Sequence, residues 1–531
     1  MKKIISIVLS VLLLFSALGA GTAAFAADEC SCGVTPIVYV KGRTDIYKDK
    51  NDLSKGLAEK NVSGGKESIK EAAINISSAF AKAMLTDEWD EYCDVLYEEI
   101  APLYDQYPCD ENGEVSNSSG IAPYWSIEET VKRAIERGRN FHIYAKDDIT
   151  LYQFQYDIRL DPIKNAADLK LFIETVKKTS GHKKVSIVSR CEGTVIANAL
   201  FNAYGWDDIE SVVMYNPIAA GAEIADSVFG NTVKFDSAGI SRMAFEFLGN
   251  DPVMDLIRSG LELSEYGGVL GSVSDFVQKI YDKVAPNVMP RLIRATFGQC
   301  PGWYGMVSPE VFEDCKNFTL GGNPDGKYDG LIEKIDNYNY GYKLKARSVL
   351  EEMKNDGVRV YVIAKYNNQM YPVMEVSDRL GDGVVSVLKQ TYNGSTCADI
   401  TKTLSDEYLA SANMKYVSPD KMIDSSTAAF PEHTWYIRDL QHDYYPSSFD
   451  PYIFKLVRYD GYADIDTFSD MPQYLRYVGV RENDNNHIEI LTSESPLPTD
   501  NQPKKSIVTI LMDFIIRVLN FIKYQFDKIK K

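Results

Sequence analysis

Residues 185–204 read VSIVSRCEGTVIANALFNAY, and they are the clearest indication of the fold class. Its apolar start is typical of a buried strand and its second half of a packed helix, with SRCEG (189–193) between them. A sharp strand-to-helix turn presents its central side chain at the carboxyl edge of a sheet, and it needs small residues two positions before and after. Gly193 meets this need fully and Ser189 in part. We therefore predict that Cys191 is a nucleophile, although a buried structural cysteine at an ordinary turn is the alternative.

Short apolar runs alternate with amphipathic helical patterns on both sides of this stretch. The expected strands are 35–40, 151–156, 185–188, 211–215 and 358–363, and the expected helices are 166–178, 193–204, 344–355 and 450–459. Such alternation predicts an α/β fold with a mostly parallel sheet covered by helices on both faces. The core is expected at 27–215, with a helical insertion at about 50–145, and again at 346–460. Residues 216–345, which include a helical pattern at 269–284, are expected to form a helical cap over the site.

Candidate partners for Cys191 follow it along the chain. The expected strand 358–363 precedes the segment GDGVV, and His442 lies near the end of the core. This is the order nucleophile, acid, histidine. We predict that His442 takes the thiol proton and later protonates the leaving alcohol, while Asp382 orients the imidazole. His433 is the alternative base and Asp378 the alternative acid.

Backbone N–H groups near the turn are the expected oxyanion donors. The N–H of Glu192 follows the nucleophile, and the N–H of Arg43 follows the first strand. The amino terminus of the helix after Cys191 is expected to lower the thiol pKa. The charge of Glu192 opposes this unless Arg190, Lys41 or Arg43 pairs with it.

Four segments resemble secreted bacterial α/β-hydrolases related to the lecithin:cholesterol acyltransferase and lipase group. They are PIVYVKG (36–42), FQYDIR (154–159), VSIVSRCEG (185–193) and GDGVV (381–385), and VVMYNPIAAGA (212–222) resembles the strand after the turn. The resemblance spans about residues 35–460 and implies an α/β-hydrolase fold acting on an ester, preferably a lipid-like one. The chain departs from the group at the nucleophile, where cysteine replaces serine, and at Lys41-Gly42, where the group has His-Gly.

The amino terminus has the pattern of a secretory signal peptide. Lys2 and Lys3 precede an apolar run, and Ala24-Phe25-Ala26 is a small-x-small cleavage signal. We expect cleavage after Ala26 and a mature protein that is secreted or held at the cell envelope. The net charge of −18 argues against nucleic acid as a partner. No metal or organic cofactor is expected, because no ligand cluster with zinc-like spacing is present.

The carboxyl terminus combines an expected polar extension or linker, 461–503, of which 482–503 is the most linker-like, with a basic amphipathic helix, 504–531. The helix holds seven Lys/Arg and two Asp, with Asp513 and Arg517 inside its apolar run. These charges are untypical of a membrane span and favour a helix lying at a membrane surface. Docking on the body of the protein, or on a copy of itself, is the alternative.

Eight cysteines remain after signal cleavage, and export permits disulfides. The spacing favours two local pairs, with one of the first two cysteines free to bond Cys397; these predicted bonds are Cys93–Cys109, Cys300–Cys315, and Cys30 or Cys32 with Cys397. Cys191 must stay unpaired to act as a nucleophile.

Two functions remain open from the sequence. The first is a secreted acyl hydrolase or acyltransferase with a Cys-His-Asp triad acting on an ester or lipid. The second is a catalytically inactive protein of the same fold that binds a ligand or partner at the cell envelope. A synthase-like acyl carrier fits less well, because activated acyl thioesters are cytoplasmic.

Overall fold

The structure is a computed structural model. The residues it describes are 34–42, 44, 46–49, 51–52, 65–104, 107–121, 151–236, 269–368, 370–371, 374, 379–400, 402–444, 450–478 and 487–495. The expected signal peptide, Arg43, Asp378 and the tail 504–531 lie outside this set. Among the described helices, none combines the length and the apolar character needed to cross a membrane.

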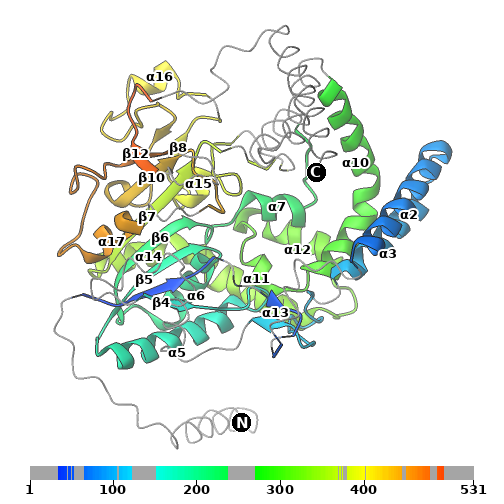
Figure 1. Cartoon of the computed structure of the whole chain (residues 1–531), viewed down its shortest axis with the longest axis horizontal. Coiled ribbons are helices and arrows are strands. Elements are labelled where there is room, and N and C mark those ends of the chain that lie inside the picture. Colours follow the sequence, from blue (N-terminus) through cyan, green and yellow to red (C-terminus); the bar gives the residue numbers. More distant parts are fainter. Residues whose placement is uncertain are drawn as a thin grey trace, which may run out of the picture.

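The described chain is built around one sheet of eight strands, in the spatial order β12-β11-β10-β7-β6-β5-β1-β4 (Figure 1). In chain order these strands are β1 (Ile37–Val40), β4 (Leu151–Phe154), β5 (Val185–Cys191), β6 (Ile209–Pro217), β7 (Arg359–Tyr366), β10 (Thr434–Arg438), β11 (Tyr474–Val478) and β12 (His487–Ile490). All neighbouring pairs are parallel except β11 and β12. The predicted α/β class with a mostly parallel sheet is confirmed.

Side chains that alternate along each strand bury themselves on opposite faces of the sheet. Ile187 and Val212 pack into one apolar cluster, whereas Val188 and Val213 pack into another. The helices α5 (Pro162–Ser180), α6 (Gly193–Tyr204) and α14 (Ala346–Asn355) cover the first face, and α17 (Asp450–Arg458) covers the second. Burial on both faces explains why the central strands are almost continuously apolar.

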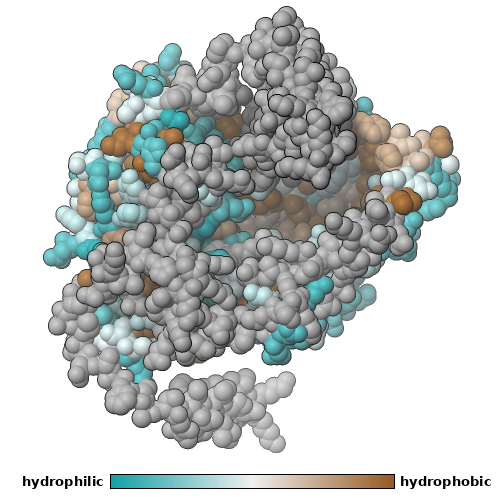
Figure 2. Space-filling view, in the orientation of Figure 1, coloured by the Kyte–Doolittle hydropathy of each residue, from teal (hydrophilic) through white to brown (hydrophobic). Residues whose placement is uncertain are grey.

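Helical segments extend the core at one side. The first insertion holds β2 (Ile46–Tyr47), α2 (Gly65–Thr86), α3 (Asp90–Ile100), η2 (Ala101–Tyr104) and β3 (Gly120–Ile121). Residues 216–345, expected to form the cap and called the cap below, hold α7 (Glu223–Phe229), α10 (Val269–Thr296), α11 (Pro301–Tyr304), η5 (Pro309–Val311), α12 (Phe312–Leu320), α13 (Asp329–Gly341) and η6 (Lys343–Lys345). α2, α3 and α10 form an arm at the side of the body in Figure 1, where α3 packs against both of the others. Figure 2 shows hydrophobic side chains on this arm and in the recess beside it.

A buried ion pair fastens the first insertion to the core. Arg159 is fully buried, and its Nε and Nη2 donate to the two carboxylate oxygens of Asp157 at 3.0 and 2.7 Å. Its Nη1 donates to the carbonyl of Tyr107 at 3.2 Å and to Ser119 Oγ at 2.8 Å. A bidentate arginine–carboxylate pair holds its two partners in one geometry. The segment 107–121 is therefore fixed on the end of β4.

The sheet continues beyond the end that the sequence predicts for the core. Residues 461–503 were expected to form a polar linker, but β11 and β12 lie within this range and are two strands of the central sheet. The strand YLRYV (474–478) holds three buried and two half-buried residues, lies next to the edge strand β12, and stands between polar segments of the sequence. Among the described residues, three short helices lie between β7 and β10, namely α15 (Val387–Gln390), α16 (Asp406–Leu409) and η7 (Pro431–His433), together with an antiparallel pair of short strands, β8 (Thr396–Cys397) and β9 (Ile423–Asp424).

Candidate active site

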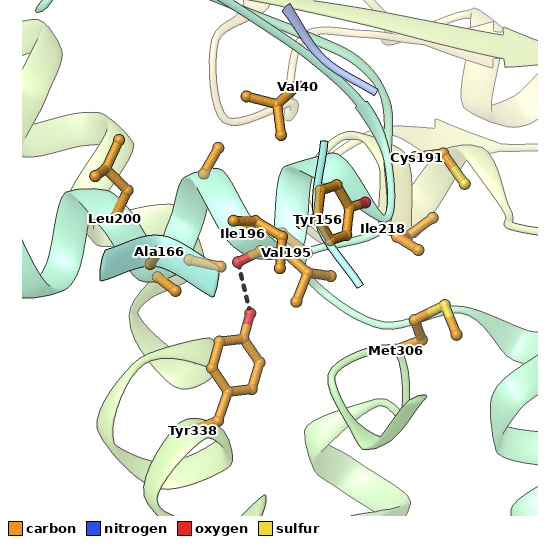
Figure 3. Close-up of a cluster of buried hydrophobic side chains, with 14 of the residues drawn as sticks. Val40, Tyr156, Ala166, Cys191, Val195, Ile196, Leu200, Ile218, Met306 and Tyr338 are labelled. Atoms are coloured by element: carbon orange, nitrogen blue, oxygen red, sulfur yellow. Dashed lines mark hydrogen bonds between the residues drawn. The ribbon is translucent and has the colours of Figure 1, made fainter. Parts of the chain in front are cut away.

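The turn at Cys191 has the strained geometry of a presented nucleophile. β5 ends at Cys191, whose φ is 50°, and α6 begins two residues later at Gly193. A cysteine rarely adopts this left-handed conformation, so the surrounding fold must hold it there. A Cβ on Gly193 would lie 2.3 Å from the carbonyl oxygen of Val40, which explains why glycine stands at this position. Figure 3 shows Cys191 above the amino-terminal end of the buried helix, near Tyr156 and Ile218.

The structure brings the predicted nucleophile, base and acid together. His442 follows β10, and its Nε2 lies 2.8 Å from the sulfur of Cys191, 251 positions away in the chain. Its Nδ1 lies 2.7 Å from Oδ2 of Asp382. All three side chains are buried. A carboxylate only accepts, so Nδ1 carries a proton and Nε2 of the neutral ring is the acceptor that faces the thiol.

The acid is held on a tight loop between β7 and α15. Oδ1 of Asp382 accepts the N–H groups of Val384 and Val385 at 3.1 and 3.0 Å, which leaves Oδ2 for the histidine. The carbonyl of Asp382 also accepts the N–H of His442 at 2.9 Å. Glu223, from α7 of the cap, accepts the N–H and the hydroxyl of Ser386 at 3.0 and 2.5 Å. The cap thereby anchors the end of the acid loop.

The segment after β1 passes directly over the turn. A Cβ on Gly42 would lie 2.8 Å from Cβ of Cys191, so only glycine permits this approach. The hydroxyl of the buried Tyr156 donates to the carbonyl of Gly42 at 2.7 Å and fixes the segment. The predicted oxyanion donors are the N–H of Glu192, at the first position after the nucleophile, and that of Arg43, which lies outside the described residues.

Glu192 changes the electrostatics of the nucleophile. Its Oε2 lies 2.6 Å from the sulfur of Cys191. Burial, followed by the charge and the hydrogen bond of Glu192, raises the pKa of the Cys191 thiol well above its usual range. The prediction that the helix terminus lowers the pKa of the Cys191 thiol is therefore wrong. A full negative charge beside the sulfur outweighs the partial positive charge at the helix end. The charge of Arg190, whose guanidinium donates to backbone carbonyls of the histidine loop, lowers this pKa by less than burial and Glu192 raise it.

One proton is shared among several acceptors at this site. The thiol carries a single hydrogen, yet Glu192 Oε2 and His442 Nε2 both lie within 2.8 Å of the sulfur. Nδ2 of Asn216 lies 3.1 Å from Nδ1 and 3.3 Å from Nε2 of the same ring. The single thiol hydrogen can be donated either to Glu192 Oε2 or to His442 Nε2, and only the second arrangement leads to proton transfer to the base. The resting nucleophile is thus a neutral thiol.

Removing the charge of Glu192 is expected to activate the thiol. In Glu192→Gln the pKa of Cys191 falls, because both the charge and the accepting carboxylate raise it. Alkylation by iodoacetamide at pH 7.5 should then accelerate by roughly tenfold, since thiolate is the reactive form. The measurement is the rate of mass labelling at Cys191. Glu352→Gln, which removes an exposed carboxylate from α14, should leave the rate unchanged; an unaltered rate in Glu192→Gln itself would contradict the assignment.

Two cations hold the histidine loop, and sequence analysis missed this role. The Nζ of the fully buried Lys365 donates to the carbonyls of Gln441, His442 and Tyr444 at 2.9 to 3.0 Å. Nη2 of Arg190 donates to the carbonyl of His442 at 3.2 Å and to the next carbonyl along the chain at 2.7 Å. Burial and the charge of Arg190 lower the pKa of Lys365. Three accepting carbonyls nevertheless require its three N–H groups, as in the ammonium form.

Asn216 is a second site residue that sequence analysis did not assign. It lies near the end of β6 with a φ of 37°, a left-handed conformation that asparagine tolerates. Its Nδ2 lies 3.1 Å from Nδ1 of His442, and its buried Oδ1 has no hydrogen-bond partner among the described residues. A signal for both missed residues was present, because Asn216 and Lys365 are polar residues near the carboxyl ends of strongly apolar strands.

The alternative base lies at the wrong end of its strand. His433 precedes β10, whereas His442 follows it. Nδ1 of His433 lies 2.9 Å from the carbonyl oxygen of Ala463, and its ring stacks on Tyr462 with centroids 3.7 Å apart. Burial lowers the pKa of His433. It is a packed core histidine away from the sulfur of Cys191.

The predicted local disulfides are wrong. The six described cysteines are free thiols. Cys93 faces α10, with its sulfur 3.8 Å from the carbonyl oxygen of Val284, and Cys315 faces the carbonyl oxygen of Asp226 at 3.7 Å. Sequence spacing suggested Cys93–Cys109 and Cys300–Cys315. In the structure the two members of each pair pack against different groups and do not face each other. Cys30 and Cys32, the expected partners of Cys397, lie outside the described residues.

Within the described residues, no group of three or more His, Cys, Asp or Glu side chains is arranged to hold a metal ion.

The comparisons with known proteins add little to this geometry. No protein-family model matches the chain, and no curated protein sequence matches it significantly. Among solved structures, the chain is similar to one in the crystal structure of a Tle4–Tli4 complex, with 11% identity and a TM-score of 0.25. That alignment covers 62% of this chain and 74% of the other, and at this TM-score it says nothing about activity.

Proposed function

We propose that this protein is a secreted acyl hydrolase or acyltransferase that acts on an ester through Cys191, His442 and Asp382. The observation that carries the proposal is the continuous contact from sulfur to imidazole to carboxylate, at 2.8 and 2.7 Å, on a turn that holds Cys191 at a φ of 50°. A buried structural cysteine needs neither this backbone strain nor an imidazole oriented by a carboxylate.

The reaction begins with transfer of the thiol proton to Nε2 of His442 as the sulfur attacks the ester carbonyl. Because burial and Glu192 raise the pKa of Cys191, proton transfer accompanies attack and does not precede it. Asp382 stabilises the imidazolium that forms. The imidazolium then protonates the leaving alcohol, which leaves a thioester on Cys191. Water, or an acceptor alcohol in a transferase, loses a proton to His442 and attacks the thioester, and the thiol is restored.

Backbone groups complete the site. The N–H of Glu192 and that of Arg43 stabilise the oxyanion of each tetrahedral intermediate. Met306, from the loop after α11 in the cap, lies near Ile218 and Cys191 in Figure 3 and adds apolar surface to this side of the turn. We take the substrate to be lipid-like on the basis of the family resemblance and this apolar cap. Contact of 504–531 with a membrane surface, and action outside the cytoplasm, are parts of the same proposal.

An ester panel tests the proposed activity. The mature protein is incubated with p-nitrophenyl esters of short and long acyl chains, before and after alkylation with iodoacetamide. We expect turnover that alkylation of Cys191 abolishes, with long chains preferred if the substrate is lipid-like. Turnover that survives complete alkylation would remove the thiol from the mechanism.

Loss of the buried cation is expected to reduce turnover without weakening substrate binding. Lys365→Met keeps the length of the side chain but leaves three carbonyls of the histidine loop without their donor. A shift of His442 by an ångström costs about 10²-fold in rate, so kcat should fall by roughly that factor while KM changes by less than about threefold. Steady-state kinetics with a melting curve measure both, and Lys184→Met at an exposed position is the control. A folded variant with wild-type kcat would show that Lys365 does not position His442.

A non-catalytic role is the second candidate, and one observation favours it. Glu192 places a negative charge 2.6 Å from the sulfur, where both thiolate and oxyanion must develop charge. A binding protein of this fold at the cell envelope does not need negative charge to develop on the sulfur or on a substrate oxygen. Absence of turnover on every ester, together with an unreactive thiol, would favour this candidate.

A further inference from the structure

Two buried thiols from distant parts of the chain meet beside the Asp157–Arg159 ion pair. Cys109 belongs to the first insertion, and Cys300 immediately precedes α11 in the cap. Both side chains are buried, and the side chain of Cys300 raises the pKa of Cys109. The sulfur of Cys300 also lies 4.0 Å from the carbonyl oxygen of Tyr107. In the described part of the chain, the other cysteine sulfurs face backbone carbonyls or, at Cys191, the candidate active site.

The segments on either side of the two thiols are held rigidly against each other. Nε1 of Trp303 donates to the hydroxyl of Tyr107 at 3.0 Å, and their rings meet edge to face with centroids 6.4 Å apart. Gly113 has a φ of 73°, and a Cβ there would lie 2.8 Å from Cγ of Pro301. Arg159 donates to the carbonyl of Tyr107 at 3.2 Å. The backbones that carry the two sulfurs are therefore fixed in proximity independently of any covalent bond.

A second set of contacts fixes the turn that follows Cys109. The carboxylate of Asp110 accepts the N–H groups of Asn112 and Glu114 at 3.0 and 2.9 Å. Nζ of Lys334, on α13, donates to the carbonyl of Asn112 at 2.5 Å and to Oε1 of Glu114 at 2.6 Å. Disulfides require closely placed Cβ atoms and little backbone movement, and a turn fastened on both sides supplies this condition.

We propose that Cys109 and Cys300 form a disulfide in the exported protein, which joins the first insertion to the cap. The oxidant is a disulfide-bearing thiol–disulfide oxidoreductase, or a small-molecule disulfide such as oxidised glutathione. The thiolate of one cysteine attacks a sulfur of that disulfide and gives a mixed disulfide. The other cysteine then displaces the carrier, so that one S–S bond forms, the carrier's bond breaks, and two electrons and both protons end on the carrier's thiols.

The environment of the thiols determines when this bond forms. Contact with Cys300, together with burial, raises the pKa of Cys109, while Arg159 lowers it. A closed pair is thus poor in thiolate and reacts slowly. We expect oxidation during folding, before the insertion closes over α11, and slow formation once the reduced protein has folded. This inference rests on the proposed export of the protein and is independent of the proposed ester chemistry.

Peptide mapping tests the bond directly. The full chain is secreted into an oxidising medium, alkylated without reduction, digested and analysed by mass spectrometry. The expected result is a linked pair of peptides holding Cys109 and Cys300, two hydrogens lighter than the sum of the free peptides. Alkylation of both thiols in the folded, oxidised protein would overturn the proposal, as would linkage of either cysteine to a different one. Cys93→Ser and Cys315→Ser should retain the link.

Thermal melting with and without a reductant gives a second test of the bond, and variants serve as its controls. Closing a loop of about 190 residues should raise the melting temperature, so addition of a phosphine reductant should lower it by roughly 5 °C. Cys109→Ser, Cys300→Ser and the double variant should each melt at the temperature of the reduced protein and respond no further to reductant. A reductant shift that persists in the double variant would assign it to another bond and contradict the proposal.

Discussion

Cys191→Ala is expected to lower kcat/KM on every ester by roughly 10⁴-fold or more. The variant removes the sulfur that lies 2.8 Å from Nε2 of His442, and with it the group that forms the proposed acyl intermediate. The alanine side chain is smaller and apolar, so the packing around the turn should survive. Stopped assays on esters, with a melting curve to verify folding, measure the effect.

The matched control for this variant is a thiol elsewhere in the chain. Cys397→Ala removes a half-buried cysteine of β8, whose sulfur faces the carbonyl oxygen of Ser395, and should retain wild-type turnover. If Cys191→Ala retained activity that iodoacetamide also failed to inhibit, a different nucleophile would be required. Equal loss in both variants would instead indicate a folding defect.

Asp382→Asn is expected to lower kcat by about 10³- to 10⁴-fold with a small change in KM. The carboxylate accepts from Nδ1 of His442 at 2.7 Å and so keeps Nε2 free to take the thiol proton. An asparagine that turns its NH₂ toward Nδ1 favours the opposite tautomer, in which Nε2 is protonated and cannot act as the base. Geometry and size are otherwise retained.

Pre-steady-state acylation separates this effect from a general loss of structure. In Asp382→Asn the rate of thioester formation should fall together with kcat, because base and acid steps both use the same imidazole. Asp399→Asn, at a half-exposed carboxylate paired with Lys402, is the control and should react normally. Full activity in Asp382→Asn would show that His442 does not require Asp382 to act as the base.

The local motifs in the sequence predicted the sheet and the groups at its edge because each depends on neighbouring residues. A strand, a turn with small residues and a helix are readable within twenty positions, and GDGVV is a tight loop wherever it stands. The choice of His442 rested on chain order, and its distances to Cys191 and Asp382 agree with that choice. The roles assigned to these residues remain predictions.

What the sequence could not show depends on tertiary packing. Lys365 interrupts an apolar strand, and only the fold shows that its ammonium group reaches three carbonyls of another loop. The pKa of Cys191 was expected to fall with the helix terminus, but burial and the adjacent Glu192 dominate. The contact between Cys109 and Cys300 joins positions far apart in the chain, which local spacing cannot predict.

The attachments of the acid and the base differ, and this has a mechanical consequence. Arg190, on β5 itself, and Lys365, on β7, tie the loop of His442 to the rigid sheet. The loop of Asp382 is bonded to His442 and to Asn368 after β7, and in addition it is tied to α7 of the cap through Glu223 and Ser386. Any displacement of the cap, such as the entry of a bulky acyl chain, would strain the acid before it disturbed the distance between sulfur and imidazole. Occupancy of the cap would then change the basicity of the His442 imidazole, while the distance between Nε2 and the sulfur of Cys191 stays the same.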